Sequence, residues 1–524
     1  MNNSCGTQQI ETPDTQTSSA NTTSIMWFRD DLRLTDNSAL AAAAAEGNVV
    51  ALYVVEDPNL TGVRALGGAS NWWLDQSLRD LAKRLDTFGI PLLTEHGDPR
   101  LALPQLANDL NATFVAWSER YHEPQRSIDA AVKEKLETSG IPVHEFPGHL
   151  LLQPWNITNG QGNPYKVFTP FGKKLKELLD EPADPAVPTQ IGPDFPLSGT
   201  GSSLDDSLSN IDALNLVPSG SQWTEGLQSR WAPGEVGAQE RFQRFITTLL
   251  NNSEGKGYAE GRDIPALKVT SELSPHLRFG EISPRFIWHS ITRSSLAPQD
   301  SKSFLSELMW RDFAWHRLFH RPNLAEVNVR SEFDHFDWLW DSENDVATTH
   351  HDLTDPRTRP LSKKARHQLP ITEADQFEKA LIAWRSGTTG IRLVDAGMRE
   401  LWATGHMHNR VRMIVASFLT KNFGIHWRHG EEWFWQTLVD ADPASNAFNW
   451  QWAAGCGDDA SPYFRVFNPE LQAKKFDPDG IYVSSWIPEL NSPNYPQPLV
   501  DLKESRAAAL EQYDRIKSLR ESPA

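Results

Sequence analysis

The sequence predicts an α/β domain with a parallel sheet, followed by a larger all-helical domain. Short apolar runs alternate with amphipathic stretches up to Pro147, whereas helical periodicity dominates from Gly234 onward. The length of 524 residues exceeds what one hydrophobic core usually serves, which also favours two domains.

The expected strands of the first domain are short apolar runs, and helical periodicity fills the stretches between them. The runs lie at 25–28, 49–55, 114–117 and 141–143, and the helical stretches lie at 37–45, 71–88 and 125–138. This alternation indicates parallel strands covered by helices, so residues 24–155 are predicted to form a Rossmann-like α/β domain. The runs are not followed by a glycine-rich phosphate loop, so the pattern leaves the ligand of this domain undetermined.

The other boundaries follow from local composition. Residues 1–23 are rich in Ser, Thr, Asn and Gln and have no apolar segment, which predicts a disordered leader rather than a signal peptide. Residues 156–233 are expected to form an interdomain linker, because Pro, Gly, Ser and Asp concentrate there from about residue 180. Residues 234–524 then form the helical domain, interrupted by a polar stretch at 341–370 that resembles an inserted loop of undetermined purpose.

Composition excludes several protein classes. No apolar run approaches the roughly 20 residues that a membrane helix needs, so no membrane partner is expected. The two cysteines, Cys5 and Cys456, can build neither a disulfide framework nor an iron–sulfur cluster, which predicts a cytoplasmic setting and no metal site. The net charge of −18 disfavours a generally basic surface, so a DNA-binding site would have to gather positive charge in a local groove.

Five sequence blocks, in the same order, resemble the photolyase/cryptochrome family. They are MWFRDDLRLTDN at 26–37, TSELSPHL at 270–277, ELMWR at 307–311, MHNRVRM at 407–413, and NAFNWQW at 446–452 continuing to FNP at 467–469. The resemblance covers nearly the whole chain apart from the leader, the linker and the 341–370 stretch. It implies an antenna-binding α/β domain followed by a helical domain that buries FAD.

The resemblance assigns a set of FAD contacts to the helical domain. They are Tyr258, Thr270, Ser271, Glu272, Leu273, Ser274, Arg412, Asp440, Ala441, Asp442 and Asn446. Hydroxyls and backbone N–H groups ahead of a helix suit a pyrophosphate, although Thr270 and Ser271 could simply cap that helix. Arg412 is expected to pair with Asp440 beside the flavin ring, and a purely structural salt bridge is the alternative. Asn446 is implied to face flavin N5, where a neutral amide favours the reduced, anionic cofactor.

A lesion pocket is implied by a second set of residues. The catalytic candidates are Glu307, Trp310, Asn409, Arg410, Met413 and Trp452. Glu307 and Trp310 are three residues apart and should share one helix face. Trp310 and Trp452 would stack on the two flipped-out bases, and Glu307 would hydrogen-bond a pyrimidine carbonyl. Each residue alone is more simply explained as a core or surface residue, but their joint spacing favours the pocket.

Two further sets follow from the same resemblance. The DNA contacts are Arg262, Glu307, Trp310, Arg311, Asn409, Arg410, Arg465 and Gln472. Arginines suit phosphate binding because their donors form a planar fork. Trp450 and Trp427 match the inner members of a tryptophan chain that reduces the flavin in light, and Trp338 is the expected outer member, with Trp340 as a close competitor.

These assignments imply a class I-like photolyase that splits cyclobutane pyrimidine dimers in damaged DNA by electron transfer from excited reduced FAD, acting as a monomer. A cryptochrome photoreceptor is the second reading. A (6-4) photolyase is third, disfavoured because Met413 stands where those enzymes place His, and a non-photoactive flavoprotein is fourth. A folate antenna is not supported by the stretch 121–125, which leaves a deazaflavin, another flavin or an empty antenna pocket.

Overall fold

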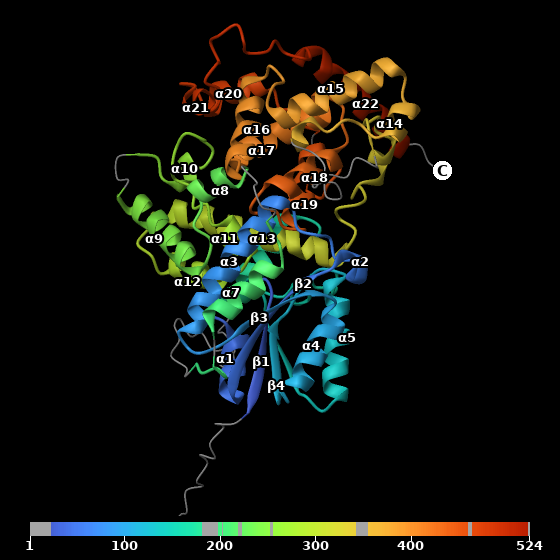
Figure 1. The fold of residues 1–524 in the computed structure, drawn as a ribbon. Coiled ribbons are helices and arrows are strands. Elements are labelled where there is room, and N and C mark those ends of the chain that lie inside the picture. Colours follow the sequence, from blue (N-terminus) through green and yellow to red (C-terminus); the bar gives the residue numbers. More distant parts are fainter. Residues whose placement is uncertain are drawn as a thin grey trace, which may run out of the picture.

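The computed structural model describes residues 22–180, 197–201, 203–217, 223–251, 255–341, 355–459 and 464–521. One parallel five-stranded sheet lies in the N-terminal part, at the bottom of Figure 1, and helices form the part above it. The strands, in the spatial order β3-β2-β1-β4-β5, are β1 (Thr23–Phe28), β2 (Asn48–Glu56), β3 (Leu92–Gly97), β4 (Phe114–Ser118) and β5 (Val143–Phe146). The predicted fold class is confirmed.

Both faces of the sheet are buried, because alternate residues of each strand enter two different apolar clusters. In β1, Met26 and Phe28 belong to one cluster, and Ile25 and Trp27 belong to the other. The five helices of this domain are α1 (Ser38–Glu46), α2 (Pro58–Thr61), α3 (Gly68–Asp86), α4 (Pro99–Asp109) and α5 (Gln125–Thr138). Helices α1 and α3 contribute to the first cluster, and α4 and α5 contribute to the second.

The predicted elements of this domain are found, whereas strand β3 and helices α2 and α4 were not expected. The four expected strands are β1, β2, β4 and β5, although β5 begins at Val143, where the expected run ended. Strand β3 was missed because only Leu92 and Leu93 are apolar in this edge strand. Helix α4 was missed as well, and it contains Pro104.

The range 156–233, expected to be a linker, carries three helices in its described part. They are α6 (Phe168–Asp180), α7 (Leu204–Ala213) and α8 (Thr224–Arg230), preceded by the short η1 (Pro154–Asn156). Helix α7 packs on the sheet, where the Ser207 hydroxyl accepts a hydrogen bond from Leu92 N at 3.3 Å and Ile211 is fully buried. Much of this range is therefore part of the folded body.

The C-terminal part is helical in all its described elements. They are α9 (Glu235–Asn251), α10 (Tyr258–Gly261), α11 (Ser274–Arg278), α12 (Pro284–Thr292), α13 (Pro298–His320), η2 (Ser331–His335), η3 (Pro356–Thr358), α14 (Lys363–Gln368), α15 (Ile371–Ser386), α16 (Arg392–Thr404), α17 (Asn409–Ser417), the π-helix η4 (Phe418–Asn422), α18 (Trp427–Thr437), α19 (Ser445–Ala454), α20 (Pro469–Phe476), α21 (Ile481–Trp486) and α22 (Leu502–Glu521). Residues 1–21 of the predicted leader and 342–354 of the predicted insertion lie outside the described residues. No helix in the described ranges has the length and apolar character required to cross a membrane.

The two domains meet through a tight backbone contact. Leu32 N donates to Phe279 O at 3.0 Å, and Arg278 forms an ion pair with Asp30 at 2.7 Å. Gly280 lies in the left-handed region with φ of 66°, and a Cβ there would come within 1.9 Å of Asp30 O. A side chain at this position would push the domains apart.

Candidate functional site

The main cavity lies in the helical domain, between α11, α13, α17 and α19. Most of the predicted site residues line it: Tyr258, Arg262, Thr270, Ser271, Glu272, Leu273, Ser274, Glu307, Arg311, Asn409, Arg412, Met413, Asp440, Ala441, Asp442, Asn446, Trp450 and Trp452. Residues separated by almost 200 positions in the chain thus line the same cavity. Six predicted residues lie outside this lining: Trp310, Arg410, Arg465, Gln472, Trp427 and Trp338.

The 270–274 segment forms an irregular turn along the cavity. Glu272 has a φ of 52°, and its carboxylate is held by Arg230 and Arg241. The residue that precedes α11 is Leu273, which makes no side-chain cap, so Thr270 and Ser271 do not serve as helix caps. The Ser274 hydroxyl donates to Asp440 Oδ2 at 2.6 Å. These contacts hold the segment in place, and all five of its residues line the cavity.

The expected pair of Arg412 and Asp440 is present. Arg412 Nη1 and Nη2 donate to the two carboxylate oxygens of Asp440 at 3.1 and 2.9 Å. Burial alone would raise the pKa of Asp440, but the Arg412 charge and the Ser274 hydroxyl hold the pKa below its ordinary value. Helix α17, which carries Arg412, begins at Asn409 because His408 Nδ1 accepts from Arg410 N at 3.2 Å. An ionised, oriented ion pair thus stands in the cavity wall.

Asn446 is held by residues that the sequence patterns did not point to. Its side-chain NH₂ donates to Glu431 O at 2.9 Å and to Glu431 Oε1 at 2.8 Å. Glu431 in turn accepts two hydrogen bonds from Arg64, at 2.9 and 3.0 Å. Glu431 stands four residues after Trp427 on α18, but Arg64 belongs to the other domain, so no local motif could have joined them.

These wall residues fit FAD. Hydroxyls and backbone N–H groups suit a pyrophosphate, and an arginine–carboxylate pair with a neighbouring amide suits the polar edge of a flavin ring. Asp442 is engaged differently, because its carboxylate accepts from Ala444 N and Ser445 N at 2.9 and 2.7 Å and so stabilises the start of α19. Burial raises the pKa of Asp442.

The lesion-pocket candidates divide into two groups. Glu307, Asn409, Met413 and Trp452 line the cavity, and Glu307 is paired with Arg262. Trp310 lies beside the cavity and stacks on Phe168, with ring centroids 3.6 Å apart and planes 8° apart. Arg410 also lies to the side, where it binds Asp263 at 2.6 Å.

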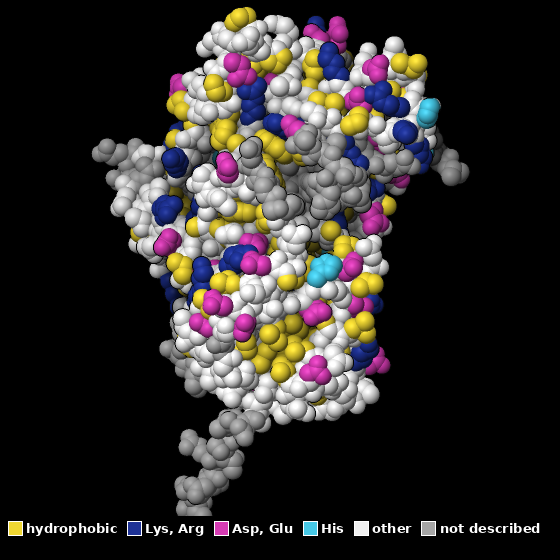
Figure 2. Space-filling view, in the orientation of Figure 1, with side chains coloured by type: hydrophobic (Ala, Val, Ile, Leu, Met, Phe, Trp, Pro, Cys, Tyr) yellow, Lys and Arg dark blue, Asp and Glu magenta, His cyan; other side chains and the backbone are white. Residues whose placement is uncertain are grey.

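The predicted DNA contacts differ in how far their side chains are engaged within the protein. Arg311 points inward and donates to His149 O at 2.8 Å and to Leu277 O at 3.2 Å. Arg465 is exposed, and Gln472 is half-buried on α20. On the face shown in Figure 2, basic and acidic side chains are interspersed, in agreement with the overall negative charge. Arg465 is therefore the predicted arginine most open to solvent.

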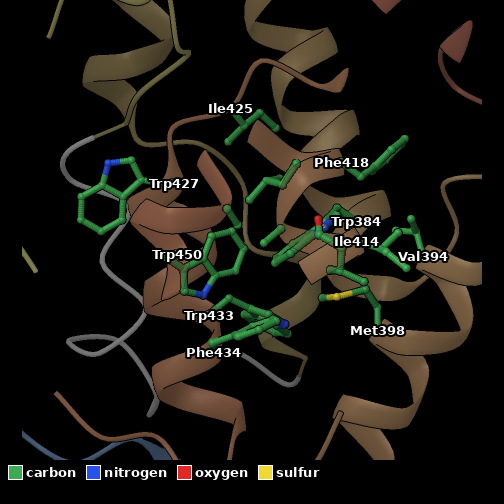
Figure 3. Close-up of a cluster of buried hydrophobic side chains, with 14 of the residues drawn as sticks. Trp384, Val394, Met398, Ile414, Phe418, Ile425, Trp427, Trp433, Phe434 and Trp450 are labelled. Atoms are coloured by element: carbon green, nitrogen blue, oxygen red, sulfur yellow. Dashed lines mark hydrogen bonds between the residues drawn. The ribbon is translucent and has the colours of Figure 1, made fainter. Parts of the chain in front are cut away.

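The two inner tryptophans of the predicted electron chain lie on α18 and α19. Trp427 and Trp450 are both buried, and Figure 3 shows them in the large cluster that also contains Trp384. The Trp450 ring crosses α18 at Gly430, where a Cβ would come within 2.0 Å of the ring. Gly430 follows Trp427 by three residues, less than one helical turn. The Trp450 ring therefore contacts α18 within one turn of Trp427.

His426 connects Trp427 with both candidates for the outer tryptophan. Its ring centroid is 5.5 Å from Trp427, 5.2 Å from Trp338 and 4.7 Å from Trp340. Trp338 is 9% exposed, and its Nε1 donates to Thr420 O at 2.8 Å. Trp340 is half-buried, with the Arg428 guanidinium 4.9 Å from its ring centroid. A hydrogen bond to a carbonyl stabilises a positively charged indole, whereas a nearby cation destabilises it.

A second cavity opens at the carboxyl ends of β1, β2 and β4. Its polar and aromatic lining includes Arg29, Asp30, Tyr53, Glu56, Arg64, Arg120, Tyr121, His122, His149, Arg278 and Trp435. Burial lowers the pKa of His122 to about 4 and that of His149 to about 3, so both imidazoles are neutral near pH 7. Crevices at the carboxyl ends of parallel strands commonly bind nucleotide-like ligands.

Comparisons with known proteins agree with this two-domain arrangement. The family model "DNA photolyase" matches residues 24–189, and "FAD binding domain of DNA photolyase" matches residues 304–494. A deoxyribodipyrimidine photo-lyase of Agrobacterium fabrum is 41% identical, with 94% of this chain and 98% of that protein covered. Cryptochrome-1 of Arabidopsis thaliana is 32% identical, with 92% and 69% covered.

A solved structure extends the similarity to the fold. The crystal structure of a bacterial class III photolyase from Agrobacterium tumefaciens has a TM-score of 0.78 and 39% identity, covering 97% of this chain and 100% of that one. The resemblance expected from the sequence is thus confirmed at the level of the family, whereas the class I-like assignment stays a prediction. Since these similarities span both domains, the chain belongs to the DNA photolyase/cryptochrome family and its helical domain binds FAD.

Proposed function

We propose that the protein repairs cyclobutane pyrimidine dimers in DNA in a light-dependent reaction. The observation that carries this proposal is the convergence of Glu307, Met413 and Trp452 on the same cavity as Asn446 and the Arg412–Asp440 pair. A lesion bound by the first group would lie directly beside a flavin held by the second. The high similarity to a deoxyribodipyrimidine photo-lyase over nearly the full length of both chains supports the same activity.

The flavin-binding residues have separate tasks in this proposal. The 270–274 segment and Tyr258 would bind the phosphates and sugars, while Arg412, Asp440 and Asn446 would bind the polar edge of the ring. When bound, reduced FAD supplies an electron to the lesion after absorbing blue light. The buried, oriented pair of Arg412 and Asp440 keeps its charges fixed during this transfer, so the site needs little rearrangement.

The lesion-binding residues would hold a dinucleotide that has left the duplex. Trp452, half-buried at the cavity, offers a stacking face, and Met413 offers an apolar contact. Stacking of one base on an aromatic ring contributes about 1–3 kcal/mol, which offsets part of the cost of flipping a base that is already poorly paired. Glu307 would donate a hydrogen bond from a protonated carboxyl group to a pyrimidine carbonyl, and Arg262 contacts this carboxyl group in the structure.

Trp450, Trp427 and Trp338 are the proposed route by which electrons reach the flavin cavity in light. Trp450 lines the cavity, and its ring contacts α18 within one turn of Trp427. The Thr420 carbonyl at Trp338 Nε1 and the Arg428 cation beside Trp340 favour Trp338 as the outer member.

The similarity to a class III photolyase favours that subclass over class I. A cryptochrome is the second candidate, supported by the similarity to Cryptochrome-1. The Met413 thioether at the lesion side disfavours a (6-4) photolyase, because that position would need a proton-transferring group. The second cavity is the proposed site of an antenna chromophore, with a deazaflavin or another flavin as the expected occupant.

A repair assay tests the proposal directly. Reduced, FAD-loaded protein is mixed with an oligonucleotide that carries one thymine cyclobutane dimer, and recovery of thymine absorbance is followed in blue light and in the dark. Light-dependent recovery on this lesion, without recovery on a (6-4) lesion, is the expected result. If the protein binds FAD and responds to light but repairs neither lesion, the cryptochrome candidate takes its place.

A further inference from the structure

Asn446 lies at the end of a hydrogen-bonded chain that begins in the other domain. The chain runs from Arg64, between α2 and α3, to Glu431 on α18 and then to Asn446 on α19. Its distances are 2.9 and 3.0 Å for the two contacts from Arg64 to Glu431, and 2.8 Å from Asn446 Nδ2 to Glu431 Oε1. Each link is of ordinary hydrogen-bond length.

This chain of hydrogen bonds permits only one orientation of the Asn446 side-chain amide. An ionised carboxylate only accepts hydrogen bonds, and the Glu431 backbone carbonyl likewise only accepts, so both groups require the NH₂ end of the amide. The amide oxygen of Asn446 is then directed away from Glu431. Asn446 lines the main cavity, and this oxygen is the polar atom that it offers to a ligand there.

Arg64 keeps Glu431 in the form that this orientation needs. The Glu431 side chain is only 2% exposed, and a buried carboxylate without a partner cation destabilises the fold. The guanidinium of Arg64 binds both carboxylate oxygens and also lies 4.3 Å from the ring centroid of Trp435. The two contacts with Glu431 and the stacking on Trp435 together fix the Arg64 side chain. A lysine could not make both carboxylate contacts in this geometry and stack on the ring.

We propose that Arg64 and Glu431 are positioning residues that aim the Asn446 amide oxygen at the flavin and thereby favour the reduced cofactor. The proposal rests on the proposed function, in which Asn446 binds the polar edge of the flavin ring, and on N5 as the ring atom that the family resemblance implies for Asn446. Reduced flavin carries a hydrogen on N5 and can donate to an oxygen, whereas oxidised flavin has only a lone pair on N5 and cannot. An oxygen fixed at this point thus stabilises the reduced state selectively.

The test compares the rate at which the reduced cofactor is reoxidised in air. In this reaction two electrons pass from the reduced flavin to dissolved oxygen, the N5 proton leaves, and the oxygen takes up protons to become hydrogen peroxide. Glu431→Gln supplies an NH₂ group that can donate to the Asn446 oxygen. The Asn446 side-chain amide is therefore expected to rotate by about 180°, so that its oxygen faces residue 431 and its NH₂ group faces the flavin. Arg64→Met removes the cation while keeping an apolar chain over Trp435.

Both substitutions are expected to speed reoxidation roughly tenfold, the ratio that corresponds to one lost hydrogen bond of ordinary strength. Arg64→Lys keeps the positive charge, so its reoxidation rate should lie between the rates of wild type and Arg64→Met. Arg100→Met is the matched control, because Arg100 lies in the same domain, pairs with Asp98 and lines neither cavity. FAD content and thermal unfolding are measured for every variant.

The outcomes separate this inference from the proposed function. Unchanged reoxidation in Glu431→Gln, with FAD bound, overturns the inference even if stability falls, because a purely structural role would lower stability alone. If Arg64→Met does not fold, Glu431→Gln decides. Faster reoxidation in a protein whose wild type repairs no dimer would keep the inference and reject the proposed function.

Discussion

One glycine shapes the packing of Trp450, a member of the proposed electron route. Gly430 is in an ordinary helical position on α18, so its glycine is required by space and not by backbone conformation. The Trp450 ring occupies the volume that a Cβ would fill, at distances of 2.0 to 2.6 Å from three ring carbons. The contact of Trp450 with α18 therefore depends on the absence of one methyl group.

We expect Gly430→Ala to displace the Trp450 ring and to slow the light-driven reduction of oxidised FAD at least severalfold. Overpacking of a buried site of this kind also costs about 1–3 kcal/mol of stability. Flash absorption spectroscopy of the FAD-loaded variant measures the reduction. Gly160→Ala is the control, because no atom lies within 4 Å of a Cβ at that position. Equal reduction rates in the two variants would contradict the proposed route.

Trp310 provides a second prediction at this scale. Phe168 covers one face of its indole, and Phe313 and Phe448 approach the ring at an angle, so a base would have to stack on the opposite face. We expect Trp310→Ala to weaken binding to dimer-containing DNA by roughly tenfold, because one stacking partner contributes about 1–3 kcal/mol. A fluorescence titration with dimer-containing DNA measures the affinity. The FAD content of the variant and its affinity for undamaged DNA are the controls, and both should be unchanged. Unchanged lesion affinity would remove Trp310 from the pocket.

Helix α13 shows how one element serves both stability and the site. Glu307 lines the cavity, whereas Asp312 is buried on another side and accepts from Leu151 N at 2.8 Å. Burial raises the pKa of Asp312 to about 7, against the opposing effect of Arg311. The folded protein therefore holds a proton on this carboxyl that the unfolded chain loses near pH 4.

The sign of the pH effect follows from this difference. Between about pH 4 and pH 7 the folded state binds the extra proton, so the free energy of unfolding falls as the pH rises, by at most about 1.4 kcal/mol per pH unit from this group. Asp312→Asn removes the effect, and the variant should gain stability relative to wild type between pH 5 and pH 8. Thermal unfolding of both proteins at pH 5 and at pH 8 measures this gain in stability. Asp479→Asn, at an exposed position, is the control. A difference in stability between Asp312→Asn and wild type that is the same at both pH values would contradict the prediction.

At the scale of the whole molecule, a buried carboxylate joins the two domains. Glu281, at 0% exposure, accepts from Trp73 Nε1 at 2.9 Å and from Gly234 N at 2.9 Å, and it also contacts Ser77 and His276. Trp73 and Ser77 belong to α3 of the N-terminal domain. One side chain thus satisfies donors from both domains.

Glu281→Gln is expected to lower the free energy of unfolding by about 3 kcal/mol, because an NH₂ group would replace one acceptor opposite several buried donors. Urea unfolding followed by tryptophan fluorescence measures the change. Glu470→Gln, on the exposed surface of α20, should leave the midpoint unchanged. A Glu281 variant as stable as wild type would show that the domains are held together elsewhere.

The sequence by itself determined the fold class, four of the five strands and, through the family resemblance, many of the residues that line the main cavity. These features depend on apolar runs, helical periodicity and motif spacing, which are local properties of the chain. It missed β3, because an edge strand needs few apolar residues, and it treated 156–233 as a linker although α7 covers the sheet.

Apart from the predicted Arg412–Asp440 pair, only the tertiary structure decided which polar groups meet. Arg64 and Glu431 are 367 positions apart, and Arg311 proved to face two backbone carbonyls where the motif alone predicted a DNA contact. Trp310 was found beside the cavity and against Phe168, a residue that no motif had marked. Such pairings depend on how whole domains pack, and a spacing rule along one helix or strand contains no information about them.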